Sequence, residues 1–365
     1  MRFPEFDGEW ERCTLGDITR NFSLRNKDKI QYPMFSVTNN RGFVPQSEQF
    51  EDREMIGEDI KAYKIIHKGD FAYNPARINV GSIAKYDNPE PCMISSLYVC
   101  FKALTQIDKE WLMQLLKTPK MNFYYNVNGE GGVRVYLFYP NFARIRTSYP
   151  SLAEQQKIAS FLSALDQRIE TQRRIIEKYE SLIKGLCEKL YQFTDASFKK
   201  LGELAEINNG DSDVQDAVLE SRQNLYPFFD RSDEVKYLPN YLYDDEAIIY
   251  AGEGSEFFPR YFKGKFALHQ RCYAITRISN TILPKYLYYF CMTQNQYFIR
   301  NAVGSTVSSL RLGIFKKLRI PVVAIDDQKH IIRVLDSFSD KLRLEKEIHM
   351  HTLHQKRALL NALFI

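Results

Sequence analysis

The chain has 365 residues, enough for about two ordinary domains with connecting elements, and its hydrophobic content of 44% can supply each domain with a core. No stretch approaches the ~18 uncharged apolar residues of a membrane span, and the charged N-terminus lacks the apolar run of a signal peptide, so we expect a cytoplasmic protein with no membrane partner. The net charge of +5 is compatible with a nucleic-acid partner but does not require one.

An internal repeat organises the chain. The stretches "CTLGDITRN" (residues 13–21) and "KKLGELAEINNG" (residues 199–210) share a Leu-Gly-acid-aliphatic opening. Further matches recur at a constant offset of 173 residues, which chance rarely produces, so the sequence indicates a duplicated domain-plus-helix. The matched pairs include Gly131 with Gly304, Leu137 with Leu310, Phe142 with Phe315, Arg146 with Arg319 and Ile158 with Ile331.

The repeat predicts four segments. These are a first globular domain (1–150), a central helix (151–193), a second globular domain (194–322) and a C-terminal helix (323–365). We therefore expect an α+β fold, with two tandem mixed α/β domains, two long helices packed as an antiparallel coiled coil, and an internal pseudo-two-fold repeat.

The first domain contains "YNPARINVGSIAKYD" (residues 73–87), in which polar side chains surround a turn at Gly81. Arg and Lys suit guanine O6 and N7, Asn suits adenine N6 and N7, and the basic residues also bind phosphate. The alternative is an ordinary polar loop. The candidate DNA contacts of this domain are Asn74, Arg77, Asn79, Ser82, Lys85 and Arg134.

The central helix is predicted to start at a capping box formed by Ser151 and Glu154, directly after Pro150. Apolar residues then alternate in steps of four and three, which is a heptad seam interrupted by Gln172. About 40 residues would give a rod about 60 Å long. The interspersed charges indicate either a solvated face or a partner surface. The predicted seam is Ile158, Leu162, Leu165, Ile169, Ile176, Tyr179, Ile183, Leu186 and Leu190.

The second domain carries "FFPRYFKGKFALHQRCY" (residues 257–273), where basic and amide side chains stand among aromatic residues around a glycine. The same base-reading argument applies, and so does the same alternative of ordinary strand and loop residues. The candidate DNA contacts here are Arg260, Lys263, Lys265, His269, Gln270, Arg271 and Arg311.

The C-terminal helix repeats the seam with a polar middle, because Glu345 falls on the position of Gln172. Two heptad helices most economically bury their seams against each other, and a polar centre would define their register at some cost in stability. Asp326 or Asp327 could cap its start. Its predicted seam residues are Ile331, Leu335, Phe338, Leu342, Leu359 and Leu363.

Catalytic motifs are missing from the sequence. The six cysteines include no C-x-x-C pair, and neither a dinucleotide-binding glycine motif nor a P-loop is found. "YNPAR" lacks the second proline and the following aromatic of an adenine methyltransferase motif, and His349 and His351 point apart on a helix. We therefore predict no catalytic residue, no cofactor site and no metal site.

The whole chain resembles the specificity subunits of type I restriction-modification systems. The resemblance rests on "PSLAEQQKIASFLSALDQRIE" (residues 150–170) after a glycine-containing loop, on its C-terminal repeat, on the two Leu-Gly-acid openings and on "GKFALHQRCY" (residues 264–273). In the second helix "IDDQKH" replaces the Glu-Gln-x-x-Ile form, and the seam centre is polar, so packing and subunit contacts there are expected to differ.

The resemblance implies a non-catalytic reader of double-stranded DNA with two target recognition domains, each taking one half of a bipartite, asymmetric target. The helices would set the gap and dock two modification subunits that carry S-adenosylmethionine and methylate a flipped adenine. Motor-nuclease restriction subunits would add ATP- and Mg-dependent cleavage. The alternatives are a coiled-coil scaffold with two protein-binding heads, and a self-contained nuclease or methyltransferase, which the missing motifs disfavour.

Overall fold

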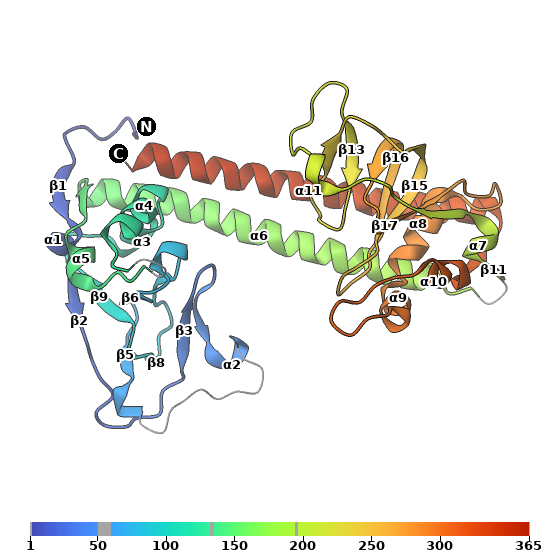
Figure 1. The fold of residues 1–365 in the computed structure, drawn as a ribbon. Coiled ribbons are helices and arrows are strands. Elements are labelled where there is room, and N and C mark those ends of the chain that lie inside the picture. The colour runs from blue at the N-terminus through green and yellow to red at the C-terminus, as the bar shows by residue number, and fades with distance from the viewer. Residues whose placement is uncertain (1, 50–59, 132–134, 194–195, 365) are drawn as a thin grey trace. The chain divides into compact units, whose positions relative to one another are not determined.

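The computed structural model describes residues 2–49, 60–131, 135–193 and 196–364. Its contacts divide the chain into two units, one made of residues 1–171 and 349–365 and the other of residues 172–348. The sequence predicted separate domains and helices, whereas each unit combines one globular domain with parts of both long helices (Figure 1). The two long helices are α6 (Leu152–Leu190) and α11 (Ile325–Leu363), each of 39 residues.

The first domain is built on a four-stranded antiparallel sheet with the strand order β2-β9-β6-β7 and three two-stranded pairs, β1 with β10, β3 with β4 and β5 with β8. The strands are β1 (Glu11–Thr14), β2 (Thr19–Phe22), β3 (Phe35–Thr38), β4 (Gly42–Pro45), β5 (Lys64–Ile66), β6 (Phe71–Tyr73), β7 (Ile83–Lys85), β8 (Cys92–Ile94), β9 (Val99–Ala103) and β10 (Arg146–Tyr149). The helices are α1 (Leu15–Ile18), α2 (Gln46–Gln49), α3 (Lys109–Leu116), α4 (Pro119–Asn128) and α5 (Tyr139–Ala143), with single turns η1 (Ile60–Ala62) and η2 (Ile78–Val80).

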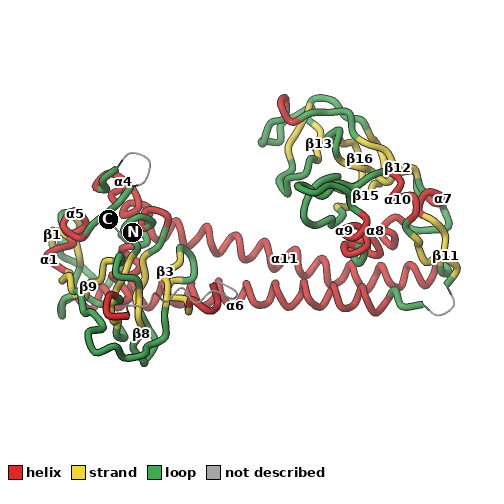
Figure 2. The backbone as a smooth tube through the Cα atoms, turned by 60° about the horizontal axis from the view of Figure 1, so that its bottom comes forward, coloured by secondary structure: helices red, strands yellow, loops and turns green. Residues whose placement is uncertain are grey.

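The second domain has a six-stranded sheet with the order β12-β17-β15-β16-β13-β14 and a separate pair of β11 with β18. Figure 2 shows the strands of this domain in yellow and its helices in red. The strands are β11 (Ser197–Lys200), β12 (Glu206–Asn209), β13 (Tyr226–Phe229), β14 (Lys236–Leu238), β15 (Tyr243–Ala251), β16 (Arg260–Leu268), β17 (Cys272–Thr276) and β18 (Arg319–Val322). The helices are α7 (Leu201–Leu204), α8 (Pro284–Met292), α9 (Asn295–Asn301) and α10 (Leu312–Lys317), with one turn η3 (Val214–Asp216).

Each domain completes its core with a helix segment from a distant part of the chain. In the first unit, Trp111 is fully buried and its ring centroid lies 5.9 Å from that of Phe364, at the end of the chain. Leu360 and Leu363 belong to the same cluster. In the second unit, Cys187 of α6 joins the cluster around Tyr286. Folding of each domain therefore requires both helices.

The two helices pack antiparallel, as predicted. In the first unit Asp166 pairs with Lys356. In the second unit Gln172 donates a hydrogen bond to the Glu345 carbonyl (3.2 Å), and Leu335 packs in the cluster that contains Cys187. Residue numbers therefore increase along α6 where they decrease along the facing side of α11, as antiparallel packing requires.

None of the seam residues is exposed. Ile158, Leu162, Ile331, Leu335 and Leu363 are buried. The others are half-buried, namely Leu165, Ile169, Ile176, Tyr179, Ile183, Leu186, Leu190, Phe338, Leu342 and Leu359.

The starts of the long helices differ from the predicted caps. The Ser151 hydroxyl accepts a hydrogen bond from the Glu154 N–H (3.4 Å), but the Glu154 carboxylate, only 1% exposed, pairs with Arg2 at 2.6 Å. A buried carboxylate requires a cationic partner, and this outcompetes the reciprocal half of the capping box. At the second helix, Asp326 lies inside the first turn and pairs with Lys329 at 3.2 Å, so it does not cap.

One contact is duplicated in detail. Gln155 is fully buried; its side-chain oxygen accepts from Asp108 N–H (2.8 Å), and its amide donates to the carbonyls of Pro150 (2.9 Å) and Gln106 (3.2 Å). Gln328 is equally buried and makes the equivalent set, accepting from the N–H of one residue and donating to two carbonyls, with Leu283 (2.8 Å), Val323 (2.9 Å) and Thr281 (3.0 Å). The internal repeat is thus visible at the level of hydrogen bonds.

Among the residues that the structure describes, no helix combines the length and the apolarity needed to cross a bilayer.

Replacing Gln155 with Ala removes all three bonds and leaves buried backbone groups unpaired, so we expect the first unit to lose about 3 kcal/mol of its free energy of unfolding. The neighbouring Gln156 is exposed, and Gln156→Ala should change stability by less than about 0.5 kcal/mol. Urea unfolding of both variants measures the difference. Equal stability of the two would contradict this role of Gln155.

Candidate nucleic-acid interface

In both domains, the same pattern of backbone hydrogen bonds holds two loops together. In the first domain, Glu130 and Tyr136 exchange two backbone hydrogen bonds, and Leu137 N–H donates to the Pro75 carbonyl (3.0 Å). In the second, Val303 and Ser309 exchange two bonds, and Leu310 N–H donates to the Gly252 carbonyl (2.7 Å). The loop after the central strand is thereby held to a second loop in each domain. Loops on such a rigid support are common positions for binding residues.

In the first domain, the turn after β6 is locally rigid. The Asn74 side chain accepts from Ala76 N–H (3.0 Å), and the Asn74 N–H donates to the Ser82 carbonyl (3.1 Å). Gly81 has φ +102°, and a Cβ there would lie 2.7 Å from the Asn39 carbonyl oxygen. Glycine is therefore required at the centre of this turn.

The turn does not present every predicted contact. Ser82 is fully buried and donates to the Val37 carbonyl (2.6 Å), so its prediction as a DNA contact is wrong, because burial under β3 removes it from the surface. The Lys85 side chain is 9% exposed and paired with Asp87 and Glu110, which neutralise it.

Two other candidates remain at the surface of this domain. Arg77 is exposed, and its guanidinium forms no hydrogen bond or ion pair with the residues that the structure describes. Asn79 donates to the Asn126 side chain (3.0 Å) and lines a hollow of about 430 Å³ with Lys117, Asn122 and Arg357. Arg134 lies outside the described residues.

In the second domain, His269, Gln270 and Arg271 form the turn between β16 and β17. Cys272 N–H donates to the His269 carbonyl (2.8 Å), so Gln270 and Arg271 are the two central residues of a tight turn. Gln270 N–H donates to the Ser212 carbonyl (3.1 Å), and the His269 Nδ1 accepts from Arg271 N–H (3.1 Å). The turn is therefore braced on both sides.

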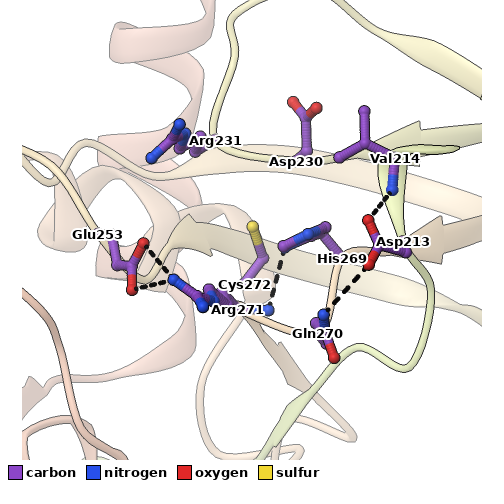
Figure 3. A pocket seen from close by; sticks show the side chains of 9 residues that line it. All are labelled: Asp213, Val214, Asp230, Arg231, Glu253, His269, Gln270, Arg271 and Cys272. Carbon is purple, nitrogen blue, oxygen red and sulfur yellow. Dashed lines mark hydrogen bonds and ion pairs between the residues drawn. The ribbon is translucent and has the colours of Figure 1, made fainter.

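This turn lines a hollow of about 310 Å³ (Figure 3). Its polar side chains come from four places, namely Asp213 before η3, Asp230 and Arg231 after β13, Glu253 after β15, and the turn itself. The Arg271 Nη1 donates to both Glu253 carboxylate oxygens (3.0 and 3.2 Å), and Gln270 Nε2 lies 3.4 Å from Asp213 Oδ2. The hollow can therefore offer both donors and acceptors to a ligand.

The remaining candidates of this domain do not line the hollow. Arg260 donates to the Ser232 carbonyl and reaches Asp233 at 3.4 Å. Lys263 pairs with Glu246 at 3.3 Å, and the Lys265 ammonium lies 4.7 Å from the centroid of the Tyr241 ring. Arg311 is exposed at the N-cap of α10, immediately after Leu310, which joins the Gly252 loop.

The carboxylates are the residues that sequence reasoning missed. Glu253 occurs in the short stretch Gly252-Glu253-Gly254, which matches no nucleotide-binding glycine motif. Its ion pair joins residues 18 positions apart, and no local pattern signals such a pair. Asp213 lies three residues after Gly210, which ends the repeated domain opening, and no sequence motif marks it as a binding residue.

The electrostatics of the hollow do not indicate a nucleophile. Burial raises the pKa of the Cys272 thiol to about 11, so it stays protonated at neutral pH. Burial also raises the pKa of Asp230, but hydrogen bonds from Lys236 (2.5 Å) and Ser232 outweigh this and hold it below its usual value. Asp230 therefore holds its own loop as a carboxylate. Within the described ranges, no group of three or more His, Cys, Asp or Glu side chains could hold a metal ion.

Comparison with known proteins identifies the family. The family described as Type I restriction modification DNA specificity domain matches residues 7–180 and again residues 194–350. The chain belongs to this family. Both halves match, as the repeat predicted.

Named relatives agree with this assignment. The chain is 30% identical over 152 residues to the type I restriction enzyme EcoDI specificity subunit of Escherichia coli, covering 40% of this chain and 33% of that protein. It is 27% identical over 220 residues to the putative MjaX specificity subunit of Methanocaldococcus jannaschii, covering 55% and 51%. The matches thus span from a third to about half the length of these relatives.

A solved structure shares the fold along the whole chain. The S subunit of a type I restriction-modification system from M. genitalium aligns with a TM-score of 0.66 and 14% identity, covering 100% of this chain and 98% of that one. A second structure, titled for complex assembly of the type I R-M system, aligns with a TM-score of 0.58 and 15% identity, covering 99% and 98%. At these identities the likeness supports the fold of two tandem domains with two long helices.

Gly252 allows the Glu253 loop to approach the turn at Arg271, since a Cβ at Gly252 would lie 2.1 Å from the Arg271 carbonyl oxygen. We expect Gly252→Ala to destabilise the second unit by about 1–3 kcal/mol. Gly185 in α6 has nothing within 4 Å of an added Cβ, so Gly185→Ala should instead stabilise the helix by about 0.5–1 kcal/mol. Thermal unfolding of the two variants tests these opposite signs.

Proposed function

We propose that this chain is the sequence-specific DNA-binding subunit of a type I restriction-modification complex. The observation that carries the proposal is the match of the DNA specificity family to both halves of the chain. Each target recognition domain then binds one half of a bipartite target, and the chain itself catalyses nothing. It works in the cytoplasm, on double-stranded DNA.

The differing loops support an asymmetric target. The turn of the first domain offers Asn79 and Arg77, which has no partner in the described part of the chain, whereas the turn of the second offers His269, Gln270 and Arg271 beside carboxylates. Different donor and acceptor patterns suit different base edges in the major groove. The two half-sites should therefore differ in sequence.

The proposed partners follow from the same assignment. The helices dock modification subunits, two of them by the symmetry of the repeat, and motor-nuclease restriction subunits join through the complex. S-adenosylmethionine, ATP and Mg belong to those partners. The competing function, a scaffold with two protein-binding heads, predicts no steep dependence of binding on salt, whereas a DNA reader that neutralises several phosphates loses affinity strongly as salt rises.

Methylome sequencing tests the function directly. Cells that carry this chain with its modification subunit are compared with cells that lack only this chain. We expect N6-methyladenine at one bipartite motif to disappear with the chain, because the modification subunit alone has no target reader. An unchanged methylome with an active modification subunit would reject the proposal in favour of the scaffold.

The helix pair is proposed to set the gap between the half-sites. Removing residues 173–179 of α6 together with residues 338–344 of α11 deletes one heptad from each helix beside the Gln172 and Glu345 pair. The two paired helices then both shorten by about 10 Å, which corresponds to about three base pairs of DNA, and their apolar seams still face each other. We expect the gap to shrink and both half-site sequences to stay the same.

The matched control deletes residues 173–179 alone. The two helices then differ in length by one heptad and cannot complete both domain cores at once, so we expect loss of assembly instead of a changed gap. A paired deletion that altered the half-site letters but kept the gap would refute the role of the helices as a spacer.

A further inference from the structure

Two arginines flank strand β17 and form the same kind of ion pair. Arg271 precedes the strand, and its Nη1 donates to both Glu253 oxygens. Arg277 follows the strand, and its Nη1 donates to both Glu206 oxygens (3.2 and 3.1 Å). Their side chains are 66% and 73% exposed. With a five-residue strand between them, the two arginines lie about 20 Å apart.

Arg271 and its partner Glu253 lie on two backbone segments that hydrogen bonds hold in place. Gly252 N–H donates to the Arg271 carbonyl (2.9 Å), and Gly254 N–H, beyond Glu253, donates to the Ser308 carbonyl (3.1 Å). The backbone of Arg271 is therefore held by its bond to Gly252, and the backbone beyond Glu253 is held by its bond to Ser308. An arginine oriented before binding loses less rotamer freedom when it meets a ligand.

The ion pair leaves one edge of the Arg271 guanidinium available. Both bonds to Glu253 come from Nη1, and Nε and Nη2 form no hydrogen bond with any residue that the structure describes. Nε and Nη2 together form a planar two-donor fork, which matches the O6 and N7 acceptors of guanine. Glu253 also offsets the charge of Arg271, which makes a plain phosphate contact a poor use of this side chain.

We propose that Arg271 reads a guanine in the half-site bound by the second recognition domain, and that Glu253 is a positioning residue for it. The inference rests on the proposed function, and it adds the base and the residue that reads it.

The test compares Arg271→Ala and Arg271→Lys with the matched variants Arg277→Ala and Arg277→Lys in the complex with its modification subunit. We expect both Arg271 variants to make one guanine position of the second half-site degenerate in the methylome. Discrimination against the other bases at that position should fall by about 10- to 100-fold for the Ala variant. The first half-site and both Arg277 variants should keep the wild-type motif.

The lysine variant separates base reading from phosphate binding. Lysine keeps the positive charge but lacks the planar fork, so a phosphate contact would survive this change while guanine reading would weaken. It also serves if Arg271→Ala fails to fold, because it replaces an exposed cation with another. A uniform loss of affinity for all sequences, with a salt dependence that is shallower by about one charge, would overturn the inference.

Glu253→Gln gives a readout that a merely structural role would not. Loss of the carboxylate should relax the same guanine position, and it should also steepen the salt dependence of DNA binding, because Arg271 is no longer offset. An intact motif in all Arg271 variants would overturn this inference alone. The absence of any bipartite motif with the wild-type chain would overturn the proposed function, and this inference with it.

Discussion

The antiparallel pairing of α6 with α11 is the constraint on which the rest of this structure depends. The core of the first domain contains Leu360, Leu363 and Phe364 from the end of the chain, and the core of the second contains Cys187 from the central helix. Neither domain buries its apolar surface fully with its own residues. Each fold is therefore completed only when the two helices lie side by side.

A polar contact supplies the register that an apolar seam lacks. Leucine and isoleucine at heptad spacing tolerate a shift by seven residues, because every seam position then finds another apolar one. Gln172 and Glu345 occupy equivalent positions in the two copies of the repeat and bond to each other. A pairing shifted by seven residues would separate the two polar groups and place Glu345 opposite Leu165 or Tyr179, which is costly for a carboxylate. The buried Gln155 and Gln328 then join each helix start to its own domain.

The duplicated scaffold carries loops that are not duplicates. Backbone hydrogen bonds at Pro75 and Gly252 hold the loops in equivalent places, yet the side chains on them differ in charge and in donor pattern. Backbone contacts tolerate almost any side chain, so the support can be maintained while the reading residues diverge. This separation of support from surface is what allows one fold to serve different targets.

The sequence by itself determined the duplication, the two long helices and the family, because these depend on periodicity and on repeated short motifs that are local to the chain. It predicted antiparallel packing only as the economical way to bury two seams, and the tertiary structure decided that the two helices pair within one chain. The sequence also located the turn at Gly81, whereas in the second domain Gly264, around which the sequence grouped the candidate contacts, lies inside β16, and the turn is formed by residues 269–271. Only the tertiary structure decided which side chains are available there. Ser82 is buried beneath another strand, Glu154 is taken by Arg2, and Arg271 is oriented by Glu253. Each of these outcomes depends on a partner that is distant in sequence, and burial and ion pairing between distant residues leave no local pattern in the sequence.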